Sequence, residues 1–133
     1  ARFRYRSANG HGREIRQLPR CSDGRGPMKI YKGFRRHGTD AVVIVENGEF
    51  TKQLDPCYDL RNHSPDGFEW GYAGSGPAQL ALALLVDAVG DKKALKYYQQ
   101  FKSHVIQNLE RGSPWSMSAD DIAEVVKTLE RVA

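Results

Sequence analysis

A histidine followed by a serine stands in a loop rich in carboxylates, and residues of these types can carry acid–base chemistry. His63 precedes Ser64, and Asp59, Asp66 and Glu69 lie within a few positions of it. An imidazole close to carboxylates can act as a general acid or base near neutral pH. Alternatively, His63 only shapes the local turn through side-chain-to-backbone hydrogen bonds. Both interpretations stay open at this point.

A second candidate follows at Gly74-Ser75-Gly76-Pro77, directly before an apolar run. Proline suits the first turn of a helix, and the unpaired N–H groups of a helix N-terminus attract anions. Gln79 stands in the first turn and would add a donor. The alternative is structural: Ser75 or Gly76 caps the helix, and the glycines permit close packing. The pattern is neither a P-loop nor a dinucleotide-binding or serine-hydrolase motif.

Aromatic residues and glycines alternate between these two candidates. Phe68, Trp70 and Tyr72 accompany four glycines in residues 62–79. Burying each ring stabilises a fold by roughly 1.5–3 kcal/mol, so the loop is predicted to be ordered. The sequence thus predicts one catalytic candidate, His63, and a set of ligand-binding candidates in the same segment: Ser64, Trp70, Tyr72, Gly74, Ser75, Gly76 and Gln79.

Three predicted strands lie ahead of this loop. Residues 28–34 alternate with period two, and residues 41–45 form a β-branched run that is typical of a strand buried on both faces. Asn47-Gly48 is a strong hairpin signal because both residues tolerate positive φ at the two central turn positions. Residues 49–54 return as the partner strand. The pattern indicates a three-stranded antiparallel meander.

Three predicted helices follow the long loop of residues 55–76. Residues 78–89 are apolar on almost every side, so this helix is expected to be central and buried, with Gly90 at its C-terminal end. Residues 91–110 carry an amphipathic stripe. A third helix begins near Ser118, with Asp121 at the capping-box position. The predicted class is α+β.

Length and charge divide the chain into two parts. The 133 residues fit one domain, and we assign residues 28–133 to a single α+β domain. Residues 1–27 carry seven arginines against two acidic residues, whereas the remainder carries 13 basic against 14 acidic residues. We interpret residues 1–27 as a flexible basic arm or a non-native extension before Met28. As a native arm it would contact nucleic acid, through Arg2, Arg4, Arg6, Arg13, Arg16 and Arg20.

Several classes of function are not indicated. No apolar run approaches the roughly 20 residues that span a bilayer, and no secretory signal is visible, so we expect a cytoplasmic protein without membrane contact. Cys21 and Cys57 are expected to be free thiols in that compartment, with a Cys21–Cys57 disulfide as the alternative. Closely spaced metal ligands are missing from the sequence, which predicts neither a metal nor a cofactor.

The same loop carries a family resemblance. Asn62-His63-Ser64-Pro65, Trp70-Gly71-Tyr72 and the run from Gly74 to Ala81 are unusual in composition. With these motifs, the chain from about Tyr31 onward resembles the domain of unknown function 6166, a family of small bacterial, archaeal and phage proteins. The resemblance implies no established activity. It implies an association with phages and mobile elements.

Two functional hypotheses follow. The first is a non-enzymatic accessory module of a phage or mobile element, which recognises an anionic ligand, a nucleic acid or a host or phage protein through residues 62–79 and the helix N-terminus. The second is a small hydrolase or transferase that uses His63 as general acid or base. We favour the first, because the loop lacks a complete catalytic set. A purely structural role for the loop is the third interpretation.

Overall fold

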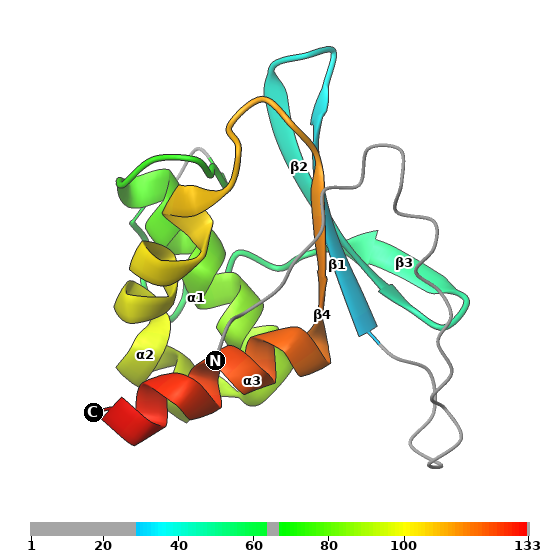
Figure 1. Cartoon of the computed structure of the whole chain (residues 1–133). Coiled ribbons are helices and arrows are strands. Elements are labelled where there is room, and N and C mark those ends of the chain that lie inside the picture. Colours follow the sequence, from blue (N-terminus) through cyan, green and yellow to red (C-terminus); the bar gives the residue numbers. More distant parts are fainter. Residues whose placement is uncertain (1–28, 64–66, 133) are drawn as a thin grey trace.

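The computed structural model describes residues 29–63 and 67–132, and these form an α+β fold (Figure 1). The predicted basic arm, residues 1–27, lies outside the described residues. The strands form a four-stranded antiparallel sheet in the order β3-β2-β1-β4. In chain order the elements are β1 (Lys29–Arg36), β2 (Asp40–Asn47), β3 (Phe50–Gln53), α1 (Ser75–Val89), α2 (Asp91–His104), η3 (Ile106–Asn108), β4 (Trp115–Ser118) and α3 (Ala119–Val132).

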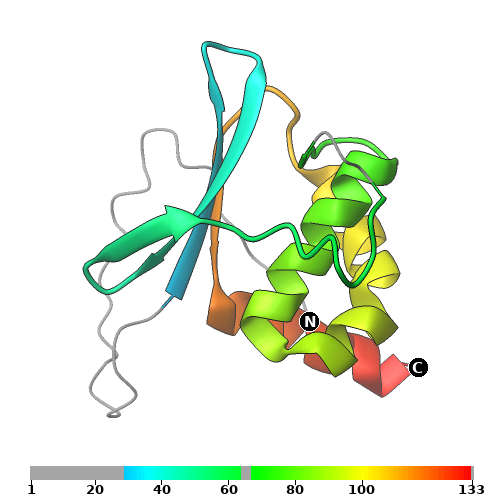
Figure 2. The same cartoon turned by 180° about the vertical axis from the view of Figure 1, so that it is seen from behind.

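The helices lie on one side of the sheet (Figures 1 and 2). Tyr31 and Val45 point to that side and are buried. On the opposite face, Val42 and Ile44 are half-buried. The prediction that this strand is buried on both faces was therefore wrong, because the helices of the described residues cover only one face of the sheet.

The β2–β3 hairpin is present, but its turn lies one residue beyond the predicted position. Asn47 still pairs with Phe50, so Gly48 and Glu49 form the turn between them. Gly48 supplies a positive φ of 68°. The Asn-Gly signal located the hairpin correctly, since a single glycine with positive φ is enough to reverse the chain here.

A fourth strand, β4, corrects the predicted three-stranded meander. It pairs with β1 in antiparallel register, with Trp115 opposite Gly33. A Cβ atom on Gly33 would lie 2.3 Å from the Trp115 ring, so only glycine leaves room for the indole. This strand has four residues and forms against an edge contributed by a segment about 80 positions earlier. The local sequence alone did not reveal such a long-range pairing.

The first helix is central and buried, as predicted. Every residue of α1 from Gly76 to Leu85 is buried. It lies beside α2 in a helical hairpin that turns at Gly90, whose N–H donates to the Val86 carbonyl at 3.1 Å. The capping box of α3 is also confirmed, because Asp121 N donates to Ser118 Oγ at 3.0 Å and Ser118 N donates to the Asp121 carboxylate at 3.3 Å.

The second helix ends at His104, six residues before its predicted end at Glu110. The Asn108 side-chain amide donates to the carbonyls of His104 at 3.1 Å and Ser103 at 3.4 Å, which satisfies the end of α2. A short 3₁₀ turn, η3, then continues the apolar stripe with Ile106 buried. None of the described helices is both long and apolar enough to cross a membrane.

Candidate functional site

Gln79 holds the long loop against α1. Its side chain is fully buried. The Oε1 atom accepts a hydrogen bond from His63 N at 2.7 Å, and the Nε2 atom donates to the carbonyls of Pro56 at 2.7 Å and Arg61 at 3.0 Å. The buried amide thus satisfies three backbone groups that would otherwise lose their hydrogen bonds to water without gaining a protein partner. The donor that we assigned to a ligand is thus used inside the fold.

His63 is positioned by the same contact and by one aromatic partner. Its Nε2 atom lies 2.7 Å from the Tyr98 hydroxyl, and the two rings are tilted at 43° with their centroids 5.5 Å apart. Among the described residues, no carboxylate or further hydroxyl contacts the imidazole. Its neighbour Ser64, a predicted ligand-binding residue, lies outside the described residues. The arrangement is a histidine–tyrosine pair rather than a catalytic set.

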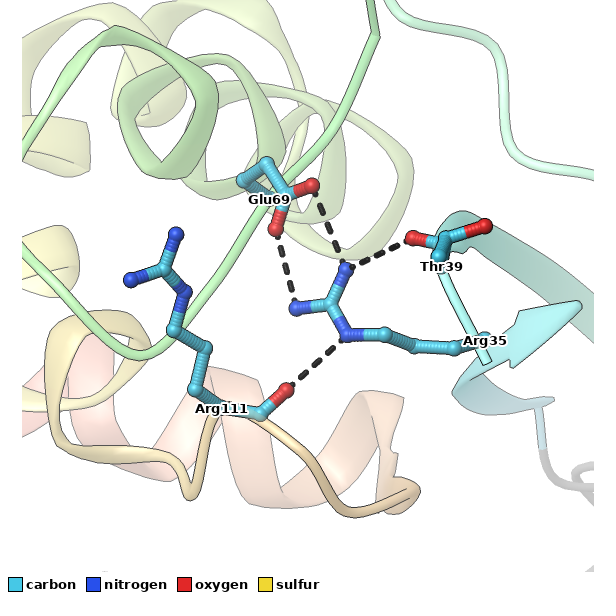
Figure 3. A network of polar contacts seen from close by, with 4 residues as sticks. All are labelled: Arg35, Thr39, Glu69 and Arg111. Carbon is cyan, nitrogen blue, oxygen red and sulfur yellow. Dashed lines mark hydrogen bonds and ion pairs between the residues drawn. The ribbon is translucent and has the colours of Figure 1, made fainter. Parts of the chain in front are cut away.

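Glu69, one of the carboxylate candidates near His63, is used in an ion pair (Figure 3). Glu69 accepts two hydrogen bonds from the Arg35 guanidinium, at 2.9 Å and 3.2 Å. The remaining Arg35 donors reach the backbone carbonyls of Arg111 at 3.0 Å and Thr39 at 3.4 Å. One side chain of β1 therefore ties together the β1–β2 turn, the loop before α1 and the segment before β4. Bidentate charge-assisted bonds of this kind fix geometry strongly.

Trp70 belongs to the core beneath this ion pair. Its side chain is fully buried, with the Arg35 guanidinium 4.4 Å above the ring centroid. Trp115 meets it edge-on, with ring centroids 5.6 Å apart. The ring that we assigned to ligand binding is therefore enclosed by its neighbours in this structure. Such an aromatic and cation–π stack stabilises the loop.

A surface remains open at the N-terminus of α1, and we call Tyr72, Gly74, Ser75 and Arg111 the Tyr72–Arg111 surface. The Arg111 guanidinium lies 4.5 Å above the Tyr72 ring centroid. That ring packs on Gly74, where a Cβ atom would lie 2.7 Å from a ring carbon. Ser75 begins α1 and is exposed. Four predicted or newly found residues thus meet at one end of one helix.

The electrostatics of this surface favour anions. Gly74 occupies the N-cap position and has no side chain to satisfy the first amides of α1, so the positive end of the helix dipole stays open. Arg111 adds a full positive charge, and no described carboxylate pairs with it. Gly76 is buried against Glu69, whose charge is already balanced by Arg35. A guanidinium and helix amides without a side-chain cap are the kinds of group that suit a small anion.

Two buried titratable groups lie elsewhere in the fold. Burial, followed by the charges of Asp55 and three further aspartates, raises the pKa of the Cys57 thiol to about 11. Burial and the hydrogen bond to Asp87 raise the pKa of Tyr31 well above its ordinary value. Both groups stay protonated near neutral pH, so neither is an activated nucleophile. The described residues contain no group of three potential ligands that could hold a metal ion.

Comparison with known proteins places the loop and its supports inside one family. Residues 31–128 match the family of unknown function DUF6166. The chain belongs to the DUF6166 family. The match includes all four residues of the Tyr72–Arg111 surface as well as Arg35 and Gln79. No curated protein and no solved structure matches the chain.

The structure thus separates the predicted site residues into three groups. His63, Trp70 and Gln79 hold the loop in place, whereas Tyr72, Gly74 and Ser75 lie at the open end of α1. Gly76 is buried beneath that end. The sequence analysis did not identify Arg35, Tyr98 or Arg111 as members of the site. These residues contact Glu69, His63 and Tyr72, respectively. Because these residues lie far along the chain from their partners, the local sequence does not indicate the contacts.

Proposed function

We propose that this DUF6166 protein is a non-enzymatic binding module whose Tyr72–Arg111 surface binds a phosphate-bearing ligand. The observation that carries the proposal is the Arg111 guanidinium, held 4.5 Å above the Tyr72 ring beside the open N-terminus of α1. Arginine donors and helix amides both suit phosphate oxygens. The Tyr72 ring itself packs on Gly74, and this contact supports the ring on which the Arg111 guanidinium lies.

The geometry around His63 gives less support to a hydrolase or transferase. The Nε2 atom is hydrogen-bonded to Tyr98, and Glu69, one of the predicted carboxylate partners, is paired with Arg35. General acid–base catalysis needs an imidazole nitrogen within reach of a reacting group. In the described part of the chain this nitrogen faces a phenol that packs in the core. We therefore keep binding as the proposed activity.

Nucleic acid is the class of ligand that would contact both this surface and the arginine-rich residues 1–27. Phosphate contacts supply most of the sequence-independent affinity for nucleic acid. The arginine-rich residues 1–27 would add salt-sensitive contacts to those made by Arg111. Such a module would act in the cytoplasm, because that reducing compartment keeps free thiols such as the buried Cys57 in the reduced state. An accessory role in a phage or mobile element stays a prediction from the family resemblance.

A titration followed by amide chemical shifts tests the proposal. Inorganic phosphate, a mononucleotide and a short single-stranded DNA are each added to the full chain at 50 and 200 mM salt. We expect shifts at the amides of Ser75 and Gly76 and weaker DNA binding at the higher salt. An Arg111→Gln variant should bind these ligands at least about tenfold more weakly than the wild type, since a charge-assisted hydrogen bond contributes roughly 1.5–3 kcal/mol.

The matched control is Arg131→Gln, which removes an exposed arginine in the last turn of α3. This variant should bind like the wild type, because it lies outside the Tyr72–Arg111 surface. Unchanged Ser75 and Gly76 shifts with all three ligands would rule out the anion site. Equal losses in both variants would show that only net charge matters.

A further inference from the structure

Arg111 lies in a turn between η3 and β4, and three contacts hold the backbone of this turn. Ser113 N donates to the Glu110 carbonyl at 3.3 Å, which closes the turn around Arg111. Arg35 Nε donates to the Arg111 carbonyl at 3.0 Å (Figure 3). The third contact comes from Gly71, whose backbone packs directly against that of Arg111. The main chain that carries the guanidinium is therefore fixed by several partners.

Gly71 stands between Trp70 and Tyr72 in the chain, and its position has no room for a side chain. A Cβ atom on Gly71 would lie 2.7 Å from the Arg111 Cβ atom and 2.8 Å from the Arg111 Cα atom. The φ of Gly71 is 91°, a value that residues with a side chain rarely adopt. Gly71 N also donates to the Ile106 carbonyl at 3.0 Å. The loop before α1 and the segment before β4 thus meet at Gly71.

We propose that Gly71, together with Arg35, is a positioning residue of the Tyr72–Arg111 surface, an inference that rests on the proposed phosphate binding. Because Gly71 lacks a side chain, the Arg111 turn can approach the loop closely. The residue after Gly71 is Tyr72, so the close approach brings the Arg111 guanidinium to 4.5 Å from the Tyr72 ring centroid. Arg35 holds the same turn through the Arg111 carbonyl.

An arginine that is held in place before the ligand arrives loses less conformational freedom on binding. Ordering one long side chain at a binding surface weakens the affinity by roughly two- to tenfold. In the free protein the Arg111 side chain already lies over the Tyr72 ring, and its main chain is fixed. Gly71 and Arg35 would therefore raise the affinity for phosphate without contacting it.

A titration of the full chain with inorganic phosphate tests this role. Gly71→Ala should weaken binding by about two- to tenfold, because the added carbon forces the Arg111 turn away. Gly112→Ala is the matched control, since it adds the same carbon next to Arg111, where no described residue apart from its chain neighbours lies within 4 Å. This control should bind like the wild type. Equal affinities of Gly71→Ala and the wild type would overturn the proposal.

An Arg111→Gln background separates positioning from a general loss of structure. In this background Gly71→Ala should weaken phosphate binding no further, because the charge that Gly71 positions is already gone. A further loss of the same size as in the wild-type background would show that Gly71 does not act through Arg111. That result would overturn the proposal.

A measurement without ligand distinguishes this inference from the proposed function. In the wild type and in Gly112→Ala, the side-chain protons of Arg111 should have NMR signals shifted upfield by the Tyr72 ring. Gly71→Ala should abolish this shift, and Arg35→Met, which removes the donor to the Arg111 carbonyl without a steric clash, should reduce it. Unchanged shifts in these variants would overturn the positioning role. Loss of the shift in a protein whose wild type binds no phosphate would uphold the positioning role and reject the proposed function.

Discussion

The loop before α1 and the β2–β3 hairpin use their side chains in opposite ways. Around the loop, Gln79 of α1 and Arg35 of β1 direct their donors to backbone carbonyls and to Glu69, and Trp70 is enclosed. In the hairpin, Phe50 is exposed, and β3 is an edge strand of the described sheet. The unusual residues of the loop and their partners therefore act mainly to hold the loop in its folded position. The hairpin, whose composition is ordinary, has few contacts with the described core.

Replacing Trp70 is expected to have the largest effect on stability. Trp70→Ala removes a fully buried indole from between Arg35 and Trp115. Substitutions of this kind cost about 3–5 kcal/mol of unfolding free energy. Urea denaturation followed by far-UV circular dichroism measures the loss. A cost below about 1 kcal/mol would mean that the loop is not held as the structure describes.

Gln79 is expected to come next. Gln79→Leu keeps the volume but leaves His63 N and the carbonyls of Pro56 and Arg61 without partners. Each buried unpaired group costs about 1–3 kcal/mol, and partial access to water should limit the total to about 2–4 kcal/mol. Gln99→Leu, on the exposed face of α2, is the control and should stay near the wild-type stability. Similar stabilities of the two variants would contradict the clamp role.

Alkaline pH provides a third test, through Cys57. Burial raises the pKa of the folded thiol to about 11, so the folded state keeps a proton that the unfolded state loses near its ordinary value. The stabilisation is complete below the unfolded pKa and is lost as pH rises toward 11. The loss should reach about 2 kcal/mol.

The comparison between wild type and Cys57→Ala isolates this effect, because Tyr31 titrates in both proteins. Urea denaturation at pH 8, 9, 10 and 11 should show a steeper decline in the wild type. Parallel declines would mean that the thiol is already accessible in the folded protein. The same burial predicts slow reaction of Cys57 with thiol reagents at pH 8.

Arg35→Lys is expected to have a smaller effect. Lysine keeps the charge but loses the bidentate contact with Glu69 and the stacking on Trp70. The Arg35 side chain is 13% exposed and that of Glu69 is 32% exposed, so solvent screens part of the ion pair. We expect a loss of about 1–2 kcal/mol in urea denaturation. Arg36→Lys, at the exposed end of β1, is the control and should have no measurable effect.

The smallest effect is expected at Phe50, and it sharpens the contrast between the two regions. Phe50→Ala should change the stability of the monomer by less than about 0.5 kcal/mol, because the ring is mostly in solvent. The matched core variant Phe101→Ala, fully buried in α2, should cost about 3–5 kcal/mol. Both variants are measured by urea denaturation at the same protein concentration. A large loss at Phe50 would show that the hairpin is packed in the monomer.

Part of the fold could be predicted because its signals are local. The turn at Gly48, the buried run of α1, the end at Gly90 and the capping box of α3 each depend on a few adjacent residues. The site was predicted less completely. Tyr72, Gly74 and Ser75 reach the open end of α1, but the charge that completes this surface comes from Arg111, which lies 39 positions after Tyr72 and carries no motif.

The sequence by itself determined three of the four strands and the positions of the three helices, since periodicity, caps and turn residues act over a few positions. The tertiary structure decided what the loop residues do. Whether Gln79 faces a ligand or a carbonyl, and whether Trp70 is a platform or part of the core, depends on contacts with residues far along the chain. It also added β4, because a four-residue strand gains its stability from the neighbouring strand and from Trp115 packing on Gly33.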